Sequence, residues 1–301
     1  MNNPNRHPLA EVFGFPINDF SETAERHRRL RLCPFNNKVP NCTKDKANNP
    51  LGVCSMFHQP TGQDEREIVI TCPIRFREQW IIAEQAAEFF FETGATWTSL
   101  AEIRLLDGTG RAAGNIDLVL VRYDDRGKIL DFGSLEIQAV YISGNIRKPF
   151  EHYMADPRQR AEMDWAKLAY YYPRPDFLSS SRKRLVPQLL YKGGILKSWG
   201  KKQAVALQTS FFNTLPNLPE TDKEHADIAW FLYDLHLAEN GLSLSLNRIV
   251  YTEFHPALQE ITTPQPGDVQ SFLDTLQNRL DRTLEGSPPD APTLDQLSAI
   301  E

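Results

Sequence analysis

The sequence has no apolar run that approaches the roughly 18 residues needed to span a bilayer as a helix. Its first residues, MNNPNRHPLAEVFG, lack the apolar segment of a secretory signal. Internal repeats and low-complexity blocks are also lacking, apart from a Pro-rich tail that begins at Gly286. These absences argue against an integral membrane protein and a repeat array, and they predict a cytoplasmic protein.

An excess of positive charge is lacking as well, because 39 Asp and Glu residues outnumber 33 Lys and Arg residues and give a net charge of −6. This balance argues against a uniformly basic nucleic-acid-binding surface, but it is compatible with a local basic groove. Of the 301 residues, 41% are hydrophobic and 24% are charged, which is ordinary globular composition with ample material for a core.

Cysteine is missing from most of the chain, because all four cysteines lie between residues 33 and 72. Cys33, Cys42, Cys54 and Cys72 are separated by 8, 11 and 17 residues, which does not match a C-x₂-C zinc ribbon. Four cysteines in a loop-rich stretch of a cytosolic chain favour a closed structural site of four thiolates, which accepts zinc or iron. The alternatives are four small buried side chains or two disulfides.

The acidic residues to which we assign the chemistry lie on two predicted strands, 116–122 and 132–142. Side chains alternate along a strand, so Glu136 and Gln138 point the same way. If Asp117 lies at matching height on the neighbouring strand, two carboxylates and a carboxamide oxygen meet at one point. Such a ligand set suits Mg²⁺. The alternative is that both acids lie on the solvated faces of ordinary strands.

The remaining periodicity predicts a mixed α/β chain. Helices are expected over 22–32, 79–91, 162–172 and 269–284, strands over 97–106 and 185–191, and a strand pair or one long strand over 242–254. Gly193-Gly194 is predicted to begin a turn, 203–212 fits a strand or a helix, and 226–237 is ambiguous. The predicted domains are an N-terminal region with the four-cysteine module (1–77), a catalytic domain (78–285) and a Pro-rich tail (286–301).

The order helix, strand, strand with Asp, strand with Glu-x-Gln and helix resembles the core of the PD-(D/E)xK nucleases, a central mixed sheet flanked by helices. The last motif position is usually Lys in that superfamily, whereas this chain has Gln138. Together with the upstream cysteines, this departure resembles the NotI-like type II restriction endonucleases, which carry an iron-binding four-cysteine module. The matching segments are Ala10-Glu11-Val12-Phe13-Gly14, Cys33-Pro34-Phe35, Cys42, Gly52-Val53-Cys54, Cys72-Pro73 and Leu135-Glu136-Ile137-Gln138.

The resemblance implies a homodimer that cuts double-stranded DNA at a GC-rich palindrome, CGGCCG or a sequence containing it, and leaves 5′ overhangs. It also implies a companion DNA methyltransferase. Asp117 and Glu136 are carried over as Mg²⁺ ligands, Gln138 as a neighbour of the attacking water, and the cysteines as iron ligands. Glu102, fifteen residues before Asp117, is at the family's spacing for an accessory acid. Because Gln138 is neutral, we expect a second metal, helped by Glu102, to supply the missing positive charge.

Basic residues are candidates for DNA contacts by composition only, since Arg and Lys read guanine in the major groove. They are Arg147, Lys148, Arg182, Lys183, Arg184, Lys201 and Lys202, with His27, Arg28, Arg29 and Arg31 as candidates for phosphate contacts. Two other functions compete with the nuclease. One is a catalytically inert DNA-binding metalloprotein with a nuclease-like fold, and the other is a glycosidase with Asp117 and Glu136 as its acid and base.

Overall fold

The computed structural model describes residues 7–36, 40–46, 48–60, 66–168, 172–238 and 241–284. The described residues up to Thr262 form one compact unit, and those from Thr263 onward belong to a second. No helix in these ranges is long and apolar enough to cross a membrane. The second unit contains the amphipathic helix α11 (Val269–Leu284), as its periodicity predicts.

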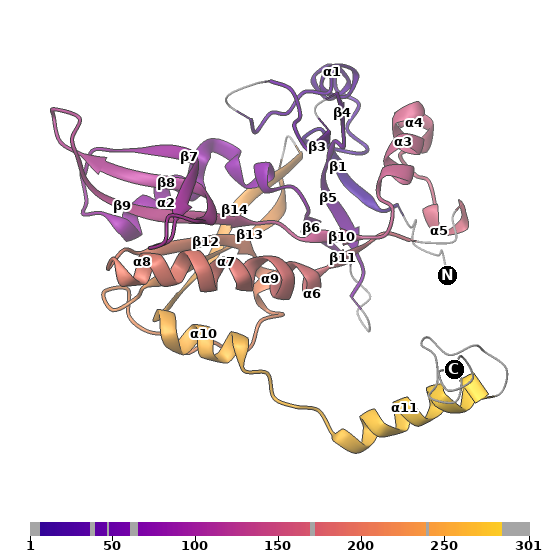
Figure 1. The fold of residues 1–301 in the computed structure, drawn as a ribbon. Coiled ribbons are helices and arrows are strands. Elements are labelled where there is room, and N and C mark those ends of the chain that lie inside the picture. Colours follow the sequence, from indigo (N-terminus) through magenta and orange to yellow (C-terminus); the bar gives the residue numbers. More distant parts are fainter. Residues whose placement is uncertain are drawn as a thin grey trace. The chain divides into compact units, whose positions relative to one another are not determined.

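A six-stranded mixed sheet forms the centre of the first unit (Figure 1). Its strand order is β14-β13-β12-β9-β8-β7; β12 runs parallel to β9 and β13, and the other neighbours are antiparallel. The strands are β7 (Trp97–Leu106), β8 (Ala112–Tyr123), β9 (Ile129–Gln138), β12 (Gln203–Gln208), β13 (Ile228–Ala238) and β14 (Gly241–Thr252). The predicted mixed α/β fold with a central mixed sheet flanked by helices is therefore confirmed.

Alternating side chains give this sheet two apolar faces, and helices cover both of them. On β12, Ala204 and Ala206 belong to the core beneath α2 (Ile81–Phe90), whereas Val205 and Leu207 belong to the core on the opposite face. A continuous helical run and α10 cover that opposite face, on the far side of the sheet from α2 (Figure 1). The segments are α6 (Phe177–Ser180), η2 (Ser181–Leu185), α7 (Val186–Gln188), η3 (Leu189–Gly193), α8 (Gly194–Ser198) and α10 (Phe254–Thr262).

A smaller four-stranded antiparallel sheet, in the order β2-β1-β5-β6, contains part of the cysteine region. Its strands are β1 (Leu9–Val12), β2 (Phe15–Pro16), β5 (Val53–His58) and β6 (Glu67–Ile70). Leu9, Val12 and Val53 share one core with β12 and β13, so the two sheets pack together. The other elements of this unit are α1 (Glu22–Leu30), β3 (Asp45–Lys46), β4 (Asn49–Pro50), η1 (Pro73–Trp80), β10 (Tyr141–Ser143), α3 (Arg147–Ala155), α4 (Pro157–Arg160), α5 (Trp165–Leu168), β11 (Arg174–Asp176) and α9 (Thr209–Phe212).

A buried ion pair links the smaller sheet to the central one. The Arg75 guanidinium donates from Nε to Glu11 on β1 at 3.0 Å, and from Nη2 to the Leu242 carbonyl on β14 at 2.9 Å. Both charged side chains are fully buried. Removing one partner of such a pair leaves an uncompensated buried charge, which is strongly destabilising. The pair therefore holds the cysteine region against the central sheet.

Several predicted elements differ in the structure. The strand predicted over 185–191 is wrong, because these residues belong to the helical run from Phe177 to Ser198. The turn predicted at Gly193-Gly194 also lies inside this run. Gly193 serves close packing instead, because a Cβ there would stand 2.7 Å from Gln203 Oε1 and 2.8 Å from Phe254 Cε2.

The helix predicted over 162–172 forms only at Trp165–Leu168, and residues 169–171 lie outside the described ranges. Trp165 is buried as expected, but Leu168 is 57% exposed and gives the helix no continuous apolar face. The ambiguous segments resolve as a strand followed by a short helix at 203–212 and as strand β13 at 228–238.

His7 gives the fold an acid-sensitive position. Its ring is 2% exposed, packs edge-on against Tyr153, and accepts a hydrogen bond at Nδ1 from the Leu9 backbone N–H at 3.1 Å. Burial lowers the pKa of this histidine from 6.5 to about 4. The folded chain therefore keeps the ring neutral at pH values where the unfolded chain protonates it.

Stability is expected to fall as the pH drops from 6.5 toward 4, because protons then bind preferentially to the unfolded chain. Lowering the pH from about 7.5 to about 4.5 should remove about 2 to 3 kcal/mol through this one group. Urea unfolding of the wild type and of His7→Asn at both pH values measures the effect. The pH-dependent loss should be smaller in His7→Asn by this amount; equal losses in the two proteins would contradict the assignment.

Candidate active site

Three acidic residues lie side by side on the neighbouring strands β7, β8 and β9. The β8–β9 register pairs Leu118 with Leu135, so the next positions, Asp117 and Glu136, face each other across the strands. The β7–β8 register pairs Ala101 with Leu118 and Ile103 with Ile116, which leaves Glu102 opposite Asp117. The sheet thus brings Glu102, Asp117 and Glu136 to one height.

The Asp117 carboxylate is fixed by the strand beside it. Its Oδ2 accepts a hydrogen bond of 2.8 Å from the Ile137 backbone N–H, at the point where the β8–β9 ladder ends. The side chain is half-buried and lines a surface cleft of about 210 Å³. One oxygen is therefore anchored by the fold, which orients the carboxylate at the cleft.

The Glu136 carboxylate is the most deeply buried acid of this group, with 2% of the residue exposed. Its Oε1 lies 2.7 Å from Nζ of Lys192, whose side chain is also buried. Both carboxylate oxygens are buried, and neither makes a hydrogen bond among the described residues, so Oε1 has the Lys192 ion pair and Oε2 has no ion pair. An unpartnered buried carboxylate oxygen is costly and calls for a cation or a proton.

The buried environment changes the pKa of the Glu136 carboxyl. Burial raises the pKa of the Glu136 carboxyl from 4.5 to about 7, the Lys192 ammonium opposes the rise, and the nearby Asp117 carboxylate adds to it. Two carboxylates this close repel each other when both are ionised. A cation bound between or beside these carboxylates would therefore be strongly stabilised by their negative charge.

Gln138 lies two residues further along β9 and lines the same cleft as Asp117. Its Nε2 donates to the Ala139 carbonyl at 2.7 Å. Because Leu135 and Ile137 belong to the core beneath α2, Glu136 and Gln138 share the opposite face, as their alternation predicts. The side chain is neutral, so it brings hydrogen-bonding groups to the cleft but no charge.

Glu102 has an unusual backbone conformation for a strand residue. Its φ is +55°, in the left-handed region that non-glycine residues rarely occupy, although the pairing continues on both sides of it. The side chain is exposed. Strained residues of this kind concentrate at functional sites. The strained backbone therefore makes Glu102, directly opposite Asp117, a candidate functional residue.

The helical run supplies residues that the sequence pattern did not identify as one group. Arg184 and Gln188 line the cleft, and Lys192 reaches Glu136. Each of the three residues follows the previous one by four positions. This spacing places polar side chains on one face of a helix, so the sequence reveals the group only if the segment is recognised as helical. Arg184 was predicted as one of seven candidates for base contacts; its guanidinium stacks on Tyr141 at 4.6 Å from the ring centroid.

The donor set of this site fits a hard divalent cation. Asp117 and Glu136 contribute adjacent carboxylates, and the unpartnered Glu136 Oε2 provides a free ligand atom. Mg²⁺ takes one or two protein carboxylates and completes its shell with water and phosphate oxygens. Within the described ranges, no cluster of three or more His, Cys, Asp or Glu side chains is arranged as a metal site, so two carboxylates are the protein ligands we consider.

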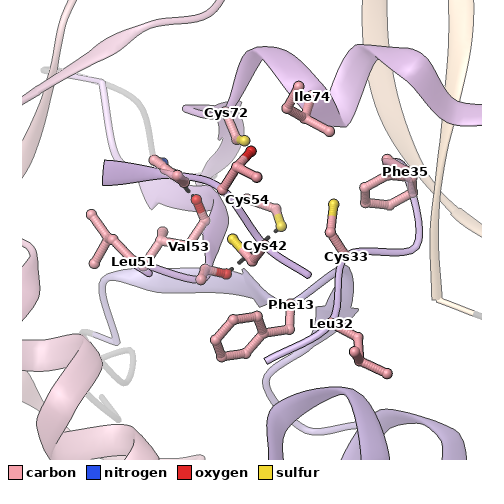
Figure 2. A pocket seen from close by; sticks show the side chains of 13 residues that line it. Phe13, Leu32, Cys33, Phe35, Cys42, Leu51, Val53, Cys54, Cys72 and Ile74 are labelled. Carbon is pink, nitrogen blue, oxygen red and sulfur yellow. Dashed lines mark hydrogen bonds between the residues drawn. The ribbon is translucent and has the colours of Figure 1, made fainter. Parts of the chain in front are cut away.

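The four cysteines surround one small cavity in the N-terminal region. Figure 2 shows their sulfur atoms around it, with Phe13, Phe35, Leu51 and Ile74 among the apolar neighbours. No two of them are joined in a disulfide. The cavity volume is about 10 Å³, which is room for one water-sized sphere. The side chains fit a tetrahedral thiolate site in kind and number, although they are not drawn together as a close ligand cluster.

The thiols are held in an apolar environment. Burial raises the pKa of Cys33 to about 11 and also raises those of Cys42 and Cys54. Lys44, which lines the same cavity, is fixed by hydrogen bonds from Nζ to the Val53 carbonyl (2.6 Å) and the Thr71 carbonyl (2.9 Å). Without a metal, burial therefore favours the neutral thiol form of Cys33, Cys42 and Cys54 in the cavity that the fixed Lys44 side chain also lines.

The other basic candidates are spread over the surface. Arg147 pairs with Asp45, and Lys201 pairs with Asp131, each at 2.6 Å. Arg28 is not a surface phosphate contact, because it is 3% exposed and donates to the Asp19 and Pro16 carbonyls. Of the predicted basic residues, Arg184 is the one that the structure places at the cleft.

Comparison with known protein families gives one informative match. The family described as "Restriction endonuclease NotI" matches residues 11–246, which is more than half of the chain. The match includes both the cysteine cavity and the row of acidic residues. No curated protein matches the chain in a sequence comparison.

Proposed function

Because the chain belongs to the NotI restriction endonuclease family and is thus a type II site-specific deoxyribonuclease that binds double-stranded DNA, we propose that Asp117 and Glu136 form its active site. The observation that carries the proposal is their cross-strand pairing beside a cleft, with one buried Glu136 oxygen unpartnered. We also propose that the six-stranded sheet is a PD-(D/E)xK core in which Gln138 replaces the usual Lys.

In this proposal, the side chains of the site prepare the phosphodiester for hydrolysis. Asp117 and Glu136 would hold a Mg²⁺ ion, with Asp117 oriented by the Ile137 N–H. The bound ion supplies charge stabilisation at the phosphate and a lowered pKa for the attacking water. Gln138 orients that water by hydrogen bonding, and Glu102 acts as an accessory acid from across the strand. A second metal near Glu102 is the source of charge that the sequence suggests.

The cleft also suggests how DNA is held. Arg184, at the mouth of the cleft, is placed to contact a phosphate or a guanine edge, since Arg binds both through paired donors. We propose a homodimer that cuts a GC-rich palindrome, CGGCCG or a sequence containing it, with 5′ overhangs, because two-fold protein symmetry matches a palindromic site. A companion methyltransferase would protect the host DNA.

The four-cysteine cavity is proposed to hold a structural iron or zinc ion. Its support is the convergence of Cys33, Cys42, Cys54 and Cys72 on one small apolar cavity. Cys72 lines this cavity, while its neighbours Thr71 and Pro73 line the cleft beside Asp117. An ion there would fix the chain segment that forms one wall of the active-site cleft.

Cleavage of a plasmid with a single CGGCCG site tests the proposal. Incubation with Mg²⁺ should linearise the plasmid, EDTA should prevent this, and sequencing of the ends should give staggered cuts with 5′ overhangs. A plasmid without the site is the matched substrate control. Binding of DNA without cleavage, on this plasmid and on a GC-rich library, would instead favour the inert DNA-binding metalloprotein.

A further inference from the structure

Lys192 is a buried cation at the centre of the site. Its side chain is 4% exposed. The ammonium Nζ lies 2.7 Å from Glu136 Oε1, donates to the Asn115 carbonyl at 2.7 Å, and donates to Gln188 Oε1 at 3.2 Å. The ammonium group thus has three oxygen neighbours, and one of them belongs to a proposed metal ligand.

The shape of the helical run places this lysine. Two segments, η2 and η3, are π-helical, and Lys192 lies in the second. Arg184 and Lys192 are eight residues apart. In a regular α-helix, eight residues rotate about the helix axis by two full turns plus about 80°, so Lys192 would point away from the face that carries Arg184. π-helical turns contain more residues per turn, and they occur frequently at functional sites. Arg184, Gln188 and Lys192 therefore stay on the face directed at the site.

We propose that Lys192 is a positioning residue for DNA cleavage, supplying from the helix the fixed positive charge that β9 lacks at Gln138. It binds Glu136 through Oε1 and leaves Oε2 for the metal. The proposal rests on the active-site assignment above and deepens it. It places the missing charge in the chain itself, whereas the sequence alone suggests a second metal near Glu102.

A purely stabilising role explains this arrangement poorly. Burying an ion pair has a desolvation cost that its attraction often fails to repay, and apolar side chains of similar volume usually stabilise a core at least as well. The neighbouring helical positions Leu185 and Leu189 are apolar and buried in that way. A buried lysine that lies 2.7 Å from a buried carboxylate is better explained by the effect of its charge on Glu136.

Charge at the site points to the same role. When Asp117 and Glu136 are both ionised they carry two negative charges, and a DNA phosphate adds a third before any bond breaks. A fixed ammonium beside Glu136 offsets part of this repulsion, and it needs no rearrangement when negative charge increases on the phosphate. Arg184 at the cleft is exposed to solvent, so it is the weaker source of such a field.

The test compares single-turnover cleavage by the wild type, Lys192→Met, and Lys192→Met combined with Gln138→Lys. Lys192→Met should cleave at least 100-fold more slowly, while its affinity for the same duplex in Ca²⁺ changes little; loss of the buried ion pair should lower its unfolding temperature but leave it folded at the assay temperature. The combined variant returns an ammonium to the site from β9, and it should recover at least tenfold in rate. If Lys192→Met is too unstable to purify, Lys192→Gln takes its place with the same expectation.

Lys197→Met is the matched control, because Lys197 belongs to the same helical run but pairs with Asp227, outside the site. It should cleave at the wild-type rate. Cleavage by Lys192→Met within threefold of the wild type would overturn the inference, as would a loss that is accompanied by lost DNA binding and not recovered by Gln138→Lys. Failure of the wild type and the control to cleave would instead overturn the proposed active-site function, so the two failures are distinguishable.

Discussion

Asp117→Asn is expected to reduce DNA cleavage by roughly 1,000-fold or more, which corresponds to about 4 kcal/mol in the activation free energy. The substitution keeps the shape of the side chain, and the retained amide oxygen can still accept from the Ile137 N–H. It removes one of the two negative charges that we propose to hold Mg²⁺. The fold should therefore survive while the chemistry is lost.

Cleavage by Asp117→Asn is measured in single-turnover reactions in Mg²⁺, and binding of the same duplex is measured in Ca²⁺. Asp125→Asn is the matched control, because Asp125 lies in the exposed turn that joins β8 and β9, away from the cleft. We expect the control to cleave normally and Asp117→Asn to bind but not cleave. Equal cleavage by the two variants would rule out Asp117 as a metal ligand.

Cys54→Ser should have the second large effect. If the four thiols hold one structural ion, the variant should lose nearly all of that metal, since a tetrahedral site is closed by four protein ligands. Structural metals contribute directly to folding, and a loss of about 4 kcal/mol would lower the unfolding temperature by roughly 10 °C in a unit of this size. Elemental analysis gives the metal content and identifies iron or zinc, and thermal unfolding gives the stability.

Thr43→Ser is the control for the cysteine variant, because Thr43 lines the same cavity without a thiol. It should keep the metal and the wild-type unfolding temperature. Loss of the cysteine metal should also slow cleavage, since Cys72 is flanked by Thr71 and Pro73 of the cleft. A purified wild-type protein that is folded and cleaves DNA without any bound iron or zinc would contradict the structural-metal assignment.

The acidic residues of the site could be predicted because strands impose a strict alternation. Once 116–122 and 132–142 are recognised as strands joined by a short polar turn, Asp117 and Glu136 are expected on neighbouring strands, and the observed register places them opposite each other. Glu136 and Gln138 share a face for the same reason. The shared face of Glu136 and Gln138 thus follows from local pattern, whereas the position of Asp117 opposite Glu136 depends on the register seen in the structure.

The helical run shows where local pattern fails. Residues 185–191 contain leucines at short intervals and Pro187, which disfavours a helix because proline lacks the N–H and clashes with the preceding turn. In the structure, the π-helical segment η2 directly precedes the helical turn α7, in which Pro187 is at one of the first positions. Packing of Leu185 and Leu189 against the sheet then overrides the local preference.

Lys192 could not be identified from the sequence for a related reason. Its partner Glu136 is far away along the chain. The Lys192–Glu136 ion pair forms only because the helical run packs over β9 on one face of the central sheet. Lys192 falls between the predicted strand 185–191 and the predicted turn at Gly193-Gly194, where a lysine is interpreted as a surface residue. The same limit applies to Arg75, whose burial against Glu11 and Leu242 depends on the packing of two sheets.

The central claim is that Asp117 and Glu136 hold the metal at which DNA is cut. A crystal structure of the protein with its duplex in Mn²⁺, with the metal located by anomalous scattering, tests this claim most directly. We predict a metal peak between the carboxylates of Asp117 and Glu136 and in contact with a DNA phosphate. A metal bound elsewhere at the cleaved phosphate, with both carboxylates unliganded, would contradict it.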